Sequence, residues 1–309
     1  MKTKLKKEDV MKKMKWFVLV SAVLFVLPLS VVAREVTPIV SHLWLEKNLA
    51  NPKVVIVDIR SEADYKGGHI PNAVHVPYDK WAITKNDLKN EFPEENDLYA
   101  LIGSSGIKSD SIVVVAGKTD STTDLVNATR VAKTLIYAGI SNVAVLSGGQ
   151  NKWAADKKPL STEMMKPKAV PYKGNLNKDI VATKEYVSSQ LGKSIFLDAR
   201  LPEFFFGISK TGDVAKFGRL PGALPLPSAW IFTDGMYKFK EELEPIAFGA
   251  AGKDLSKEII LFCDTGRLST GWWYVLREVL GYKNVKSYDA SLQEWSKDPN
   301  APMVRYSWQ

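Results

Sequence analysis

The chain has 309 residues, of which 45% are hydrophobic and 25% charged, a composition that is ordinary for a globular protein long enough for two domains. Its formal net charge is +8, but seven lysines and two acids lie in the first 33 residues, and their removal leaves 35 basic and 32 acidic residues, or +3. No basic stripe interleaved with aromatic residues remains, so nucleic acid is excluded as an expected partner.

The N-terminal segment has the order of a secretory signal. A lysine-rich start runs into an apolar stretch over residues 16–33, which ends at the small residue Ala33. We therefore predict a signal peptide over residues 1–33, cleavage after Ala33 and a periplasmic or secreted protein. The alternative is an uncleaved anchor, because about 18 apolar residues is the lower limit for crossing a bilayer. Only in that case is the membrane an expected partner.

The rest of the chain repeats one pattern. Asp-x-Arg stands at residues 58–60 and again at 198–200, each time after a short apolar run typical of a strand. The skeleton Gly-x-aliphatic-Pro-x-Ala-x-x-x-Pro then begins at Gly68 and at Gly218. A duplicated pattern of this length predicts two copies of one folding unit.

Later elements continue the duplication. The expected pairs, in chain order, are strands at 111–116 and 258–263, helices at 125–138 and 269–280 ending at Gly139 and Gly281, strands at 143–146 and 285–288, and the tryptophans Trp153 and Trp295. Strands that alternate with helices pair in parallel and have helices on both sheet faces. The expected fold class is α/β, with two three-layer domains, each a mainly parallel sheet flanked by helices.

The domain boundaries are placed at a segment that is rich in proline and lysine. Residues 156–178 contain three prolines, many lysines and no periodic apolar pattern, which is typical of an exposed linker. We predict an N-terminal domain at 34–160, a linker at 161–178 and a C-terminal domain at 179–309. The second copy holds about ten extra residues around 207–217, expected as a surface loop insertion.

The two copies differ most at the end of the third strand, where the second has Cys263, the only cysteine, and the first has Ala116. One cysteine excludes an internal disulfide. In parallel α/β sheets ligands bind beyond the carboxyl ends of strands. Main-chain N–H groups of the turn and the following helix N-terminus would favour a thiolate, so we expect a lowered pKa for Cys263. Gly266 permits the tight turn of the loop. The positive charge of Arg267 would also favour the thiolate, whereas the negative charge of Asp264 would disfavour it.

In this order and in duplicate, the Asp-x-Arg, Gly-x-x-Pro-x-Ala and Cys-x-x-Gly elements resemble the rhodanese family from residue 35 to the C-terminus. The resemblance implies an inactive first domain and a catalytic second domain. It implies a sulfurtransferase in which a cysteine persulfide takes sulfur from a small anionic donor, thiosulfate or 3-mercaptopyruvate, and passes it to cyanide or a thiol. Such double displacement implies neither a cofactor nor a metal.

The resemblance also implies roles for individual residues. Cys263 would be the nucleophile, Arg200 would face the anionic donor, and Asp198 would order the strand end. Arg200 could instead form an ion pair between the domains, and His69 could line the cleft as a proton relay or be structural. The loop expected to hold the persulfide comprises Asp264, Thr265, Gly266, Arg267, Leu268 and Ser269.

Three positions depart from the family pattern. Thiosulfate enzymes often have a second arginine where this chain has Phe204, and a basic residue where it has Asp264; Thr265 only partly matches the mercaptopyruvate pattern. Both donors therefore stay open.

Two other classes of protein are considered. A cysteine phosphatase needs an arginine at the sixth position after the cysteine to bind phosphate. This chain has Ser269 there, which disfavours that class of enzyme. A non-catalytic exported sulfur carrier or binding module remains the alternative. An exported thiol would be kept reduced by its persulfide cycle or by a partner reductase.

Overall fold

The computed structural model describes residues 34–307. The predicted signal peptide at 1–33 and its cleavage site lie outside the described residues, apart from Arg34 itself. Between residues 34 and 307, no helix combines the length and the apolarity needed to cross a membrane.

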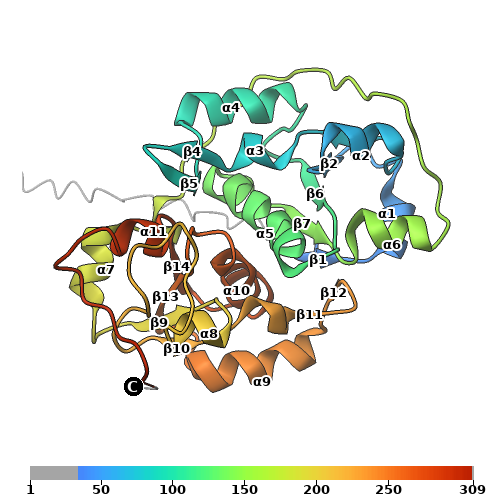
Figure 1. Cartoon of the computed structure of the whole chain (residues 1–309). Helices are drawn as coiled ribbons and strands as arrows, with labels where there is room; N and C mark the ends of the chain where they lie inside the picture. Colours follow the sequence, from blue (N-terminus) through green and yellow to red (C-terminus); the bar gives the residue numbers. More distant parts are fainter. Residues whose placement is uncertain (1–33, 308–309) are drawn as a thin grey trace, which may run out of the picture. The chain divides into compact units, whose positions relative to one another are not determined.

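The first half of the described chain is built on a parallel five-stranded sheet with the order β1-β7-β6-β2-β3 (Figure 1). Its strands are β1 (Ile39–Val40), β2 (Val54–Asp58), β3 (Val74–His75), β6 (Ile112–Ala116) and β7 (Val143–Leu146). β6 is buried along its whole length, as expected for an apolar run of β-branched residues in the middle of a parallel sheet.

The second half has a parallel sheet of the same topology, in the order β10-β9-β13-β14-β8. Its strands are β8 (Val181–Ala182), β9 (Ile195–Asp198), β10 (Leu224–Pro225), β13 (Glu258–Phe262) and β14 (Asn284–Tyr288). Each strand occupies the place that its repeat partner has in the first sheet, so the duplication seen in the sequence is a duplication of structure. The predicted fold class is confirmed.

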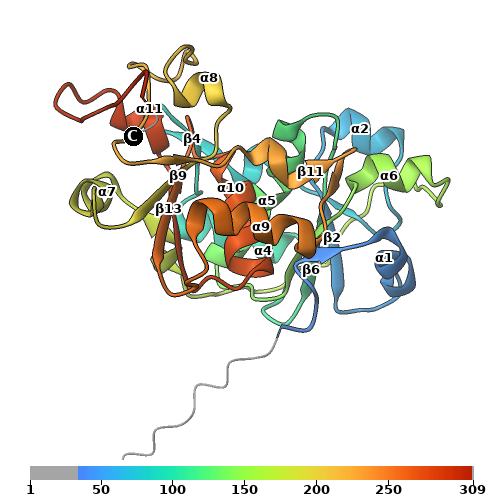
Figure 2. The same cartoon turned by 90° about the horizontal axis from the view of Figure 1, so that it is seen from below.

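Helices cover both faces of each sheet (Figures 1 and 2). In the first half they are α1 (His42–Asn48), α2 (Glu62–Gly67), α3 (Tyr78–Trp81), α4 (Glu95–Ser104), α5 (Thr122–Tyr137) and α6 (Gly149–Ala155). In the second half they are η1 (Lys178–Ile180), α7 (Lys184–Gln190), α8 (Pro202–Phe205), η2 (Ser228–Ile231), α9 (Lys240–Ala251), α10 (Ser269–Tyr274), η3 (a π-helix, Val275–Val279) and α11 (Ser291–Trp295). Two short antiparallel hairpins complete the described part: β4 (Ile83–Lys85) with β5 (Leu88–Glu91), and β11 (Phe232–Thr233) with β12 (Met236–Tyr237).

Local sequence accounts for the principal helix ends. The Ser121 hydroxyl accepts a hydrogen bond from the Asp124 N–H and caps α5. Gly139 and Gly281 follow α5 and the π-helix with φ angles of 101° and 80°, the left-handed region that glycine adopts without strain. Both glycines stand at the helix ends predicted from the sequence.

Alternate residues of the central strands face two different cores. Val113 and Val115 of β6, with Ile259 and Leu261 of β13, belong to one cluster that runs through both halves. The other face of each sheet packs against its own helices in a separate cluster. The two halves therefore share one apolar core.

Helices α5 and α10 form the centre of this shared core (Figure 2). The buried hydroxyls of Thr129 and Thr270 lie 3.1 Å apart across it. A β-carbon on Gly271 would come within 3.1 Å of the Val126 side chain, so the two helices approach closely. Because α10 begins directly after the cysteine loop, this packing places the first half against that loop.

The segment that includes the predicted linker has only exposed and half-buried residues. Residues 156–177 contain no helix, no strand beyond a single bridge at Ser161 and no buried residue. The Val170 N–H donates to the Gly103 carbonyl at 3.0 Å, which holds the linker along α4.

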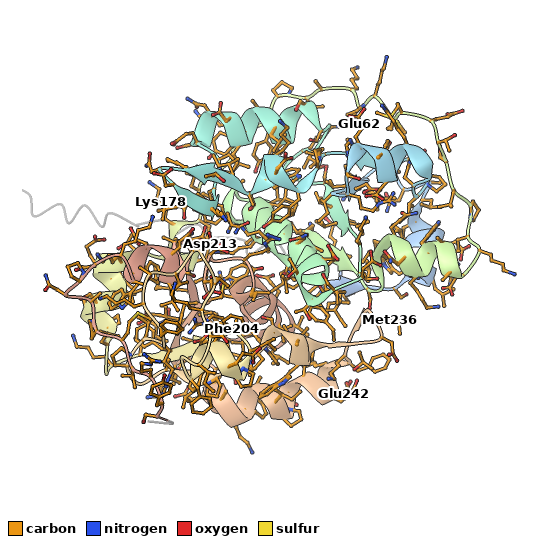
Figure 3. The ribbon with its side chains drawn as sticks, in the orientation of Figure 1. Glu62, Lys178, Phe204, Asp213, Met236 and Glu242 are labelled. Atoms are coloured by element: carbon orange, nitrogen blue, oxygen red, sulfur yellow. The ribbon has the colours of Figure 1, made fainter. Side chains whose placement is uncertain are left out.

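The insertion around 207–217 is more than the surface loop predicted. Val214 is 1% exposed and packs in the core of the second half. Asp213, labelled in Figure 3, forms an ion pair with Lys89 of the β4–β5 hairpin, with Nζ and Oδ1 2.7 Å apart. The segment is a loop, as predicted, but it does not lie wholly on the surface, because Val214 anchors it in the core and Asp213 contacts the first half.

Candidate active site

Cys263 directly follows β13, at the carboxyl end of the central strand of its sheet, and the loop after it leads into α10. In the first half, Ala116 ends the equivalent strand β6 and pairs with Asp58, as Phe262 pairs with Asp198. The residue at the place of Cys263 is therefore Gly117, which accepts from the Gln150 N–H as Cys263 accepts from the Leu292 N–H, and the predicted match with Ala116 was wrong. Gly266 has a φ of 72°. A β-carbon there would meet the Asp289 carbonyl oxygen at 1.9 Å, so the tight turn excludes a side chain for two separate reasons.

Hydrogen-bond donors converge on the Cys263 sulfur. The main-chain N–H groups of Ser269 and Thr265 lie beside it and counter the rise of its pKa, while the nearby Ser269 hydroxyl donates to the Gly266 carbonyl at 3.3 Å. The start of the loop is fixed by α11, because the Cys263 N–H donates to the Ser291 hydroxyl at 3.2 Å and the Cys263 carbonyl accepts from the Leu292 N–H at 3.2 Å. Of the loop N–H groups predicted to face the sulfur, those of Thr265 and Ser269 lie beside it.

The expected lowering of the thiol pKa was wrong. Cys263 is 1% exposed, and this burial raises the pKa of its thiol above the usual range. The Ser269 N–H opposes the rise, and the Asp264 carboxylate adds to it. Sequence reasoning weighed the donors and Asp264 but had no measure of desolvation, which is the largest contribution here.

Arg200 is held entirely within the second half. Its Nε donates to Asp198 Oδ1 at 2.9 Å, its Nη1 to Asp264 Oδ1 at 3.0 Å, and its Nη2 to Asp198 Oδ2 at 2.7 Å and to the Gly218 carbonyl at 2.8 Å. The guanidinium is 1% exposed. The alternative of an ion pair between domains is wrong, since both carboxylate partners belong to the same half. Asp198 also accepts from the Arg200 N–H, which orders the strand end as predicted.

The cysteine-free half contains the same arrangement. Arg60 donates from Nε to Asp58 Oδ1 at 3.0 Å, and from Nη2 to Asp58 Oδ2 at 2.7 Å and to the Gly68 carbonyl at 2.9 Å. Because the clamp is present in a half that has no cysteine, it serves the fold there. The second half differs in adding Asp264 to the clamp, and this occupies the guanidinium face that donor binding by Arg200 would need.

His69 also has structural contacts. Its ring stacks on Tyr65 with centroids 3.6 Å apart, and Nδ1 lies 2.8 Å from the Tyr65 carbonyl oxygen. In the second half, Arg219 takes the same place over Phe205 at 4.0 Å. His69 is 1% exposed and these partners belong to its own half, which favours the structural role over the proton relay.

Arg267 is the partly exposed cation of the loop. Its guanidinium lies 5.3 Å from the ring centroid of Tyr78, and Nη1 is 3.4 Å from Asn127 Oδ1, so both contacts come from the first half. The neighbouring Leu268 carbonyl accepts from the Ser228 hydroxyl at 2.6 Å, which fixes the end of the loop.

A buried charge cluster lies behind the loop. Asp289 Oδ1 accepts from Arg130 Nη1 at 2.9 Å and from Lys133 Nζ at 2.5 Å, and both cations come from α5 of the first half. Burial lowers the pKa of Lys133 to about 8. Nearby, burial raises the pKa of Glu91 to about 7, with the Asp289 charge adding to the rise.

Sequence reasoning missed the residues brought to the loop by the first half, Tyr78 and Asn90, and by the end of β14 and the start of α11, Asp289 and Ser291. None of these residues belongs to a repeated motif. Asn90 and Ser291 have left-handed φ angles of 61° and 52°, which no sequence pattern predicted. Over residues 34–307, no group of three or more His, Cys, Asp or Glu side chains is placed to hold a metal ion.

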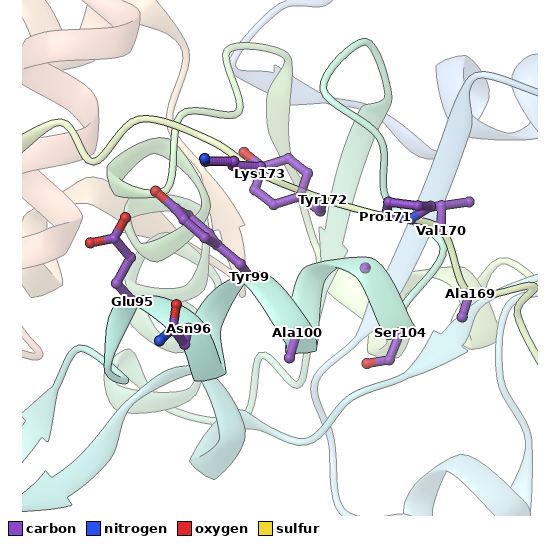
Figure 4. Close-up of a pocket in the computed structure, with 11 residues that line it drawn as sticks. Glu95, Asn96, Tyr99, Ala100, Ser104, Ala169, Val170, Pro171, Tyr172 and Lys173 are labelled. Carbon is purple, nitrogen blue, oxygen red and sulfur yellow. The ribbon is translucent and has the colours of Figure 1, made fainter.

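Two large surface grooves lie outside the cysteine loop. One of about 770 Å³ lies between α4 and the linker and is lined by Tyr99, Tyr172 and Lys173 among others (Figure 4). Another of about 800 Å³ is lined mainly by residues 37–43 and by the β11–β12 hairpin. Neither includes a residue of the cysteine loop.

Comparison with known proteins gives the family. A family model described as a Rhodanese-like domain matches the chain twice, over residues 41–156 and 183–298. A protein of Mycolicibacterium smegmatis named "Putative thiosulfate sulfurtransferase" is 32% identical over 275 residues, which cover 86% of this chain and 96% of that protein. The "Sulfur carrier protein TtuD" of Thermus thermophilus is 28% identical over 291 residues, with 86% and 96% covered.

Solved structures agree in fold. SseA from Escherichia coli, described with the rhodanese fold and catalytic mechanism of 3-mercaptopyruvate sulfotransferases, has a TM-score of 0.71 at 24% identity, covering 83% of this chain and 99% of that chain. YnjE has a TM-score of 0.77 at 21% identity, with 87% and 68% covered. With two family matches and two copies of one topology, the chain is a tandem-domain member of the rhodanese family of sulfurtransferases.

Proposed function

We propose that this protein is a thiosulfate-type sulfurtransferase that carries sulfane sulfur as a persulfide on Cys263, with 3-mercaptopyruvate as the alternative donor. The observation that carries the proposal is the position of Cys263 at the carboxyl end of β13, with the Thr265 and Ser269 N–H groups of the following loop beside its sulfur. Donors fixed in a buried site stabilise negative charge on that sulfur, both before and after sulfur transfer.

The reaction has two displacements. The Cys263 thiolate attacks the outer sulfur of thiosulfate, the S–S bond breaks, and sulfite leaves with the bonding electron pair. Cyanide or a thiolate then attacks the outer sulfur of the persulfide, which restores the Cys263 thiolate and releases thiocyanate or a new persulfide. With 3-mercaptopyruvate, the C–S bond breaks instead, and the carbon takes up a proton to give pyruvate.

Arg267 is our choice for the donor-binding cation. Arg200 is neutralised by Asp198 and Asp264, whereas Arg267 is partly exposed and has no carboxylate partner among the described residues. A guanidinium stacked on Tyr78 keeps its edge available for an oxyanion. Arg267→Gln should therefore raise the KM for thiosulfate more than it lowers kcat.

Intact mass gives the direct test. The protein from residue 34 onward is incubated with thiosulfate or with 3-mercaptopyruvate, desalted and weighed, then treated with cyanide while thiocyanate is measured. We expect a gain of one sulfur atom with the preferred donor and its loss on treatment with cyanide. Cys263→Ser serves as the matched control and should show neither. If the wild-type protein gains no sulfur from either donor, the persulfide is ruled out.

A sulfur carrier is the second candidate. Cys263 is 1% exposed and burial raises its thiol pKa, so exchange with small molecules is expected to be slow. A carrier would accept sulfur from a partner protein and yield no thiocyanate at a useful rate. Turnover with cyanide distinguishes the enzyme from the carrier, since both would hold the same adduct.

Export remains part of the proposal. Removal of residues 1–33 would leave Arg34 at the N-terminus of a periplasmic or secreted protein. The mass of the protein purified from the exported fraction of its host would give the cleavage site. Retention of the segment in a membrane fraction would favour the anchor instead.

A further inference from the structure

Asn90 is the place where the first half reaches the cysteine loop. It lies in β5, is 7% exposed and has a φ of 61°. Asparagine and glycine are the residues that tolerate this left-handed conformation best. Its buried amide occupies a defined position in the interface between the halves.

Both ends of the Asn90 amide are used. Nδ2 donates to Thr265 Oγ1 at 3.0 Å and to the Thr265 carbonyl at 3.3 Å, while Oδ1 accepts from the Tyr78 hydroxyl at 2.7 Å. The main-chain carbonyl of Asn90 accepts from Arg130. A carbonyl oxygen can only accept, so the contact with Thr265 fixes which end of the amide is the nitrogen.

A second contact supports the loop from the same strand. The Gln293 side chain accepts from the Lys89 N–H and donates to the Lys89 carbonyl, each at 2.9 Å. The Gln293 N–H in turn donates to the Asp264 carbonyl at 2.8 Å. Strand β5 therefore contacts the loop directly at Thr265 and, through Gln293, at Asp264.

Thr265 links Asn90 to the Cys263 sulfur. Its N–H is one of the donors to the Cys263 sulfur, while its carbonyl and hydroxyl are bound by Asn90. We propose that Asn90 is a positioning residue for Cys263: it holds Thr265 so that this N–H faces the thiolate and then the persulfide. The cysteine-free half thus completes the reactive loop. The inference rests on the proposed persulfide chemistry and assigns to the first half a part in it.

The test uses the acidity and the reactivity of the only cysteine. Asn90→Gly keeps the left-handed backbone and removes the side chain. Asn86→Gly makes the same change at an exposed left-handed position of the same hairpin, with φ 50°, and is the matched control. Both variants leave unchanged the charged and titratable groups around the loop: Asp264, Arg200, Tyr78, Arg267, Asp289, Arg130 and Lys133.

Alkylation of Cys263 by iodoacetamide is followed by intact mass across pH. The midpoint of the rate profile reports thiol acidity, and the plateau at high pH reports access. We expect Asn90→Gly to move the midpoint to higher pH, which lowers the rate about three- to ten-fold at a fixed pH below it, as for the loss of one oriented donor to an anion. Asn86→Gly should overlay the wild-type profile. Turnover should show a lower kcat with a smaller change in KM.

Asn90→Asp provides a second route if the glycine variant is unstable. It keeps the size of the side chain and an acceptor for Tyr78, but it cannot donate to Thr265 when ionised. The midpoint should again move to higher pH. If both Asn90 variants give the midpoint and kcat of Asn86→Gly, the inference is wrong. A wild-type protein that forms no persulfide would remove the proposed function, while the comparison of midpoints would still decide the role of Asn90.

Discussion

The main-chain carbonyl oxygen of Asp289 occupies the space that a side chain on Gly266 would need, 1.9 Å from the position of its β-carbon. The same Asp289 holds the two buried cations of α5 through its carboxylate. The turn of the cysteine loop and the interface between the halves therefore meet at one residue.

Gly266→Ala should displace the loop. The new methyl group collides with a fixed carbonyl and also strains a φ of 72°, so we expect a loss of about 3 kcal/mol or more in unfolding free energy and a loss of sulfur transfer. Gly281→Ala is the matched control, with a φ of 80° and no atom within 4 Å of its β-carbon. It should lose only about 1 kcal/mol. Equal losses in denaturant melts would show that the contact with Asp289 is unimportant.

Arg60→Lys and Arg200→Lys should weaken the fold alike. Each removes the two-pronged contact with an aspartate and the bond to a glycine carbonyl, at about 1–3 kcal/mol. Urea melts of the two variants measure the losses. Only Arg200→Lys should also change the thiosulfate kinetics, through Asp264, and mainly in kcat. If Arg200→Lys raised only the KM for thiosulfate, and by a large factor, the result would show that Arg200 binds the donor.

Asp264→Asn should make Cys263 more acidic. The Asp264 carboxylate raises the pKa of the thiol, second to burial among the causes of the rise, and the amide removes that charge. A larger fraction of thiolate then exists at neutral pH, so alkylation at pH 7 should be several-fold faster. Asp254→Asn, at an exposed aspartate before β13, is the control and should match wild type. An unchanged rate for Asp264→Asn would mean that Arg200 already cancels the effect.

Glu91→Gln should stabilise the protein in a pH-dependent way. Burial raises the pKa of Glu91 to about 7, so the folded protein keeps a proton that the unfolded chain releases near pH 4.5, and stability falls as pH rises between these values. The glutamine variant avoids this loss. We expect a gain of roughly 1–3 kcal/mol at pH 8 and little gain at pH 4.

Thermal or urea melts at both pH values measure the effect of Glu91→Gln. Glu95→Gln, at an exposed position of α4, controls for the removal of a charge. A gain that is the same at pH 4 and pH 8 would contradict the titration of Glu91.

Much of the fold could be predicted from local pattern. The strands expected at 143–146 and 258–263 are β7 and β13 to within one residue, and the tryptophans Trp153 and Trp295 are buried in both halves. Apolar runs, caps and glycines act over a few residues, so they can be read along the chain. The position of Cys263 at a strand end followed from the same local signals.

The surroundings of Cys263 could not be predicted in this way. Asn90 and Tyr78 come from elements about 175 residues earlier in the chain, as the contact of Asn90 with Thr265 illustrates. Such contacts depend on how α5 packs on α10, which no short pattern encodes. The raised thiol pKa and the pairing of Asp264 with Arg200 follow from the same burial.

The proposed persulfide would form on a buried thiol in a chain that has one cysteine. Because the chain contains no second cysteine, nothing within it can act as a resolving thiol toward Cys263. An outer sulfur bound there cannot be discharged by closing an intramolecular bridge, so its lifetime is set by the arrival of an external acceptor.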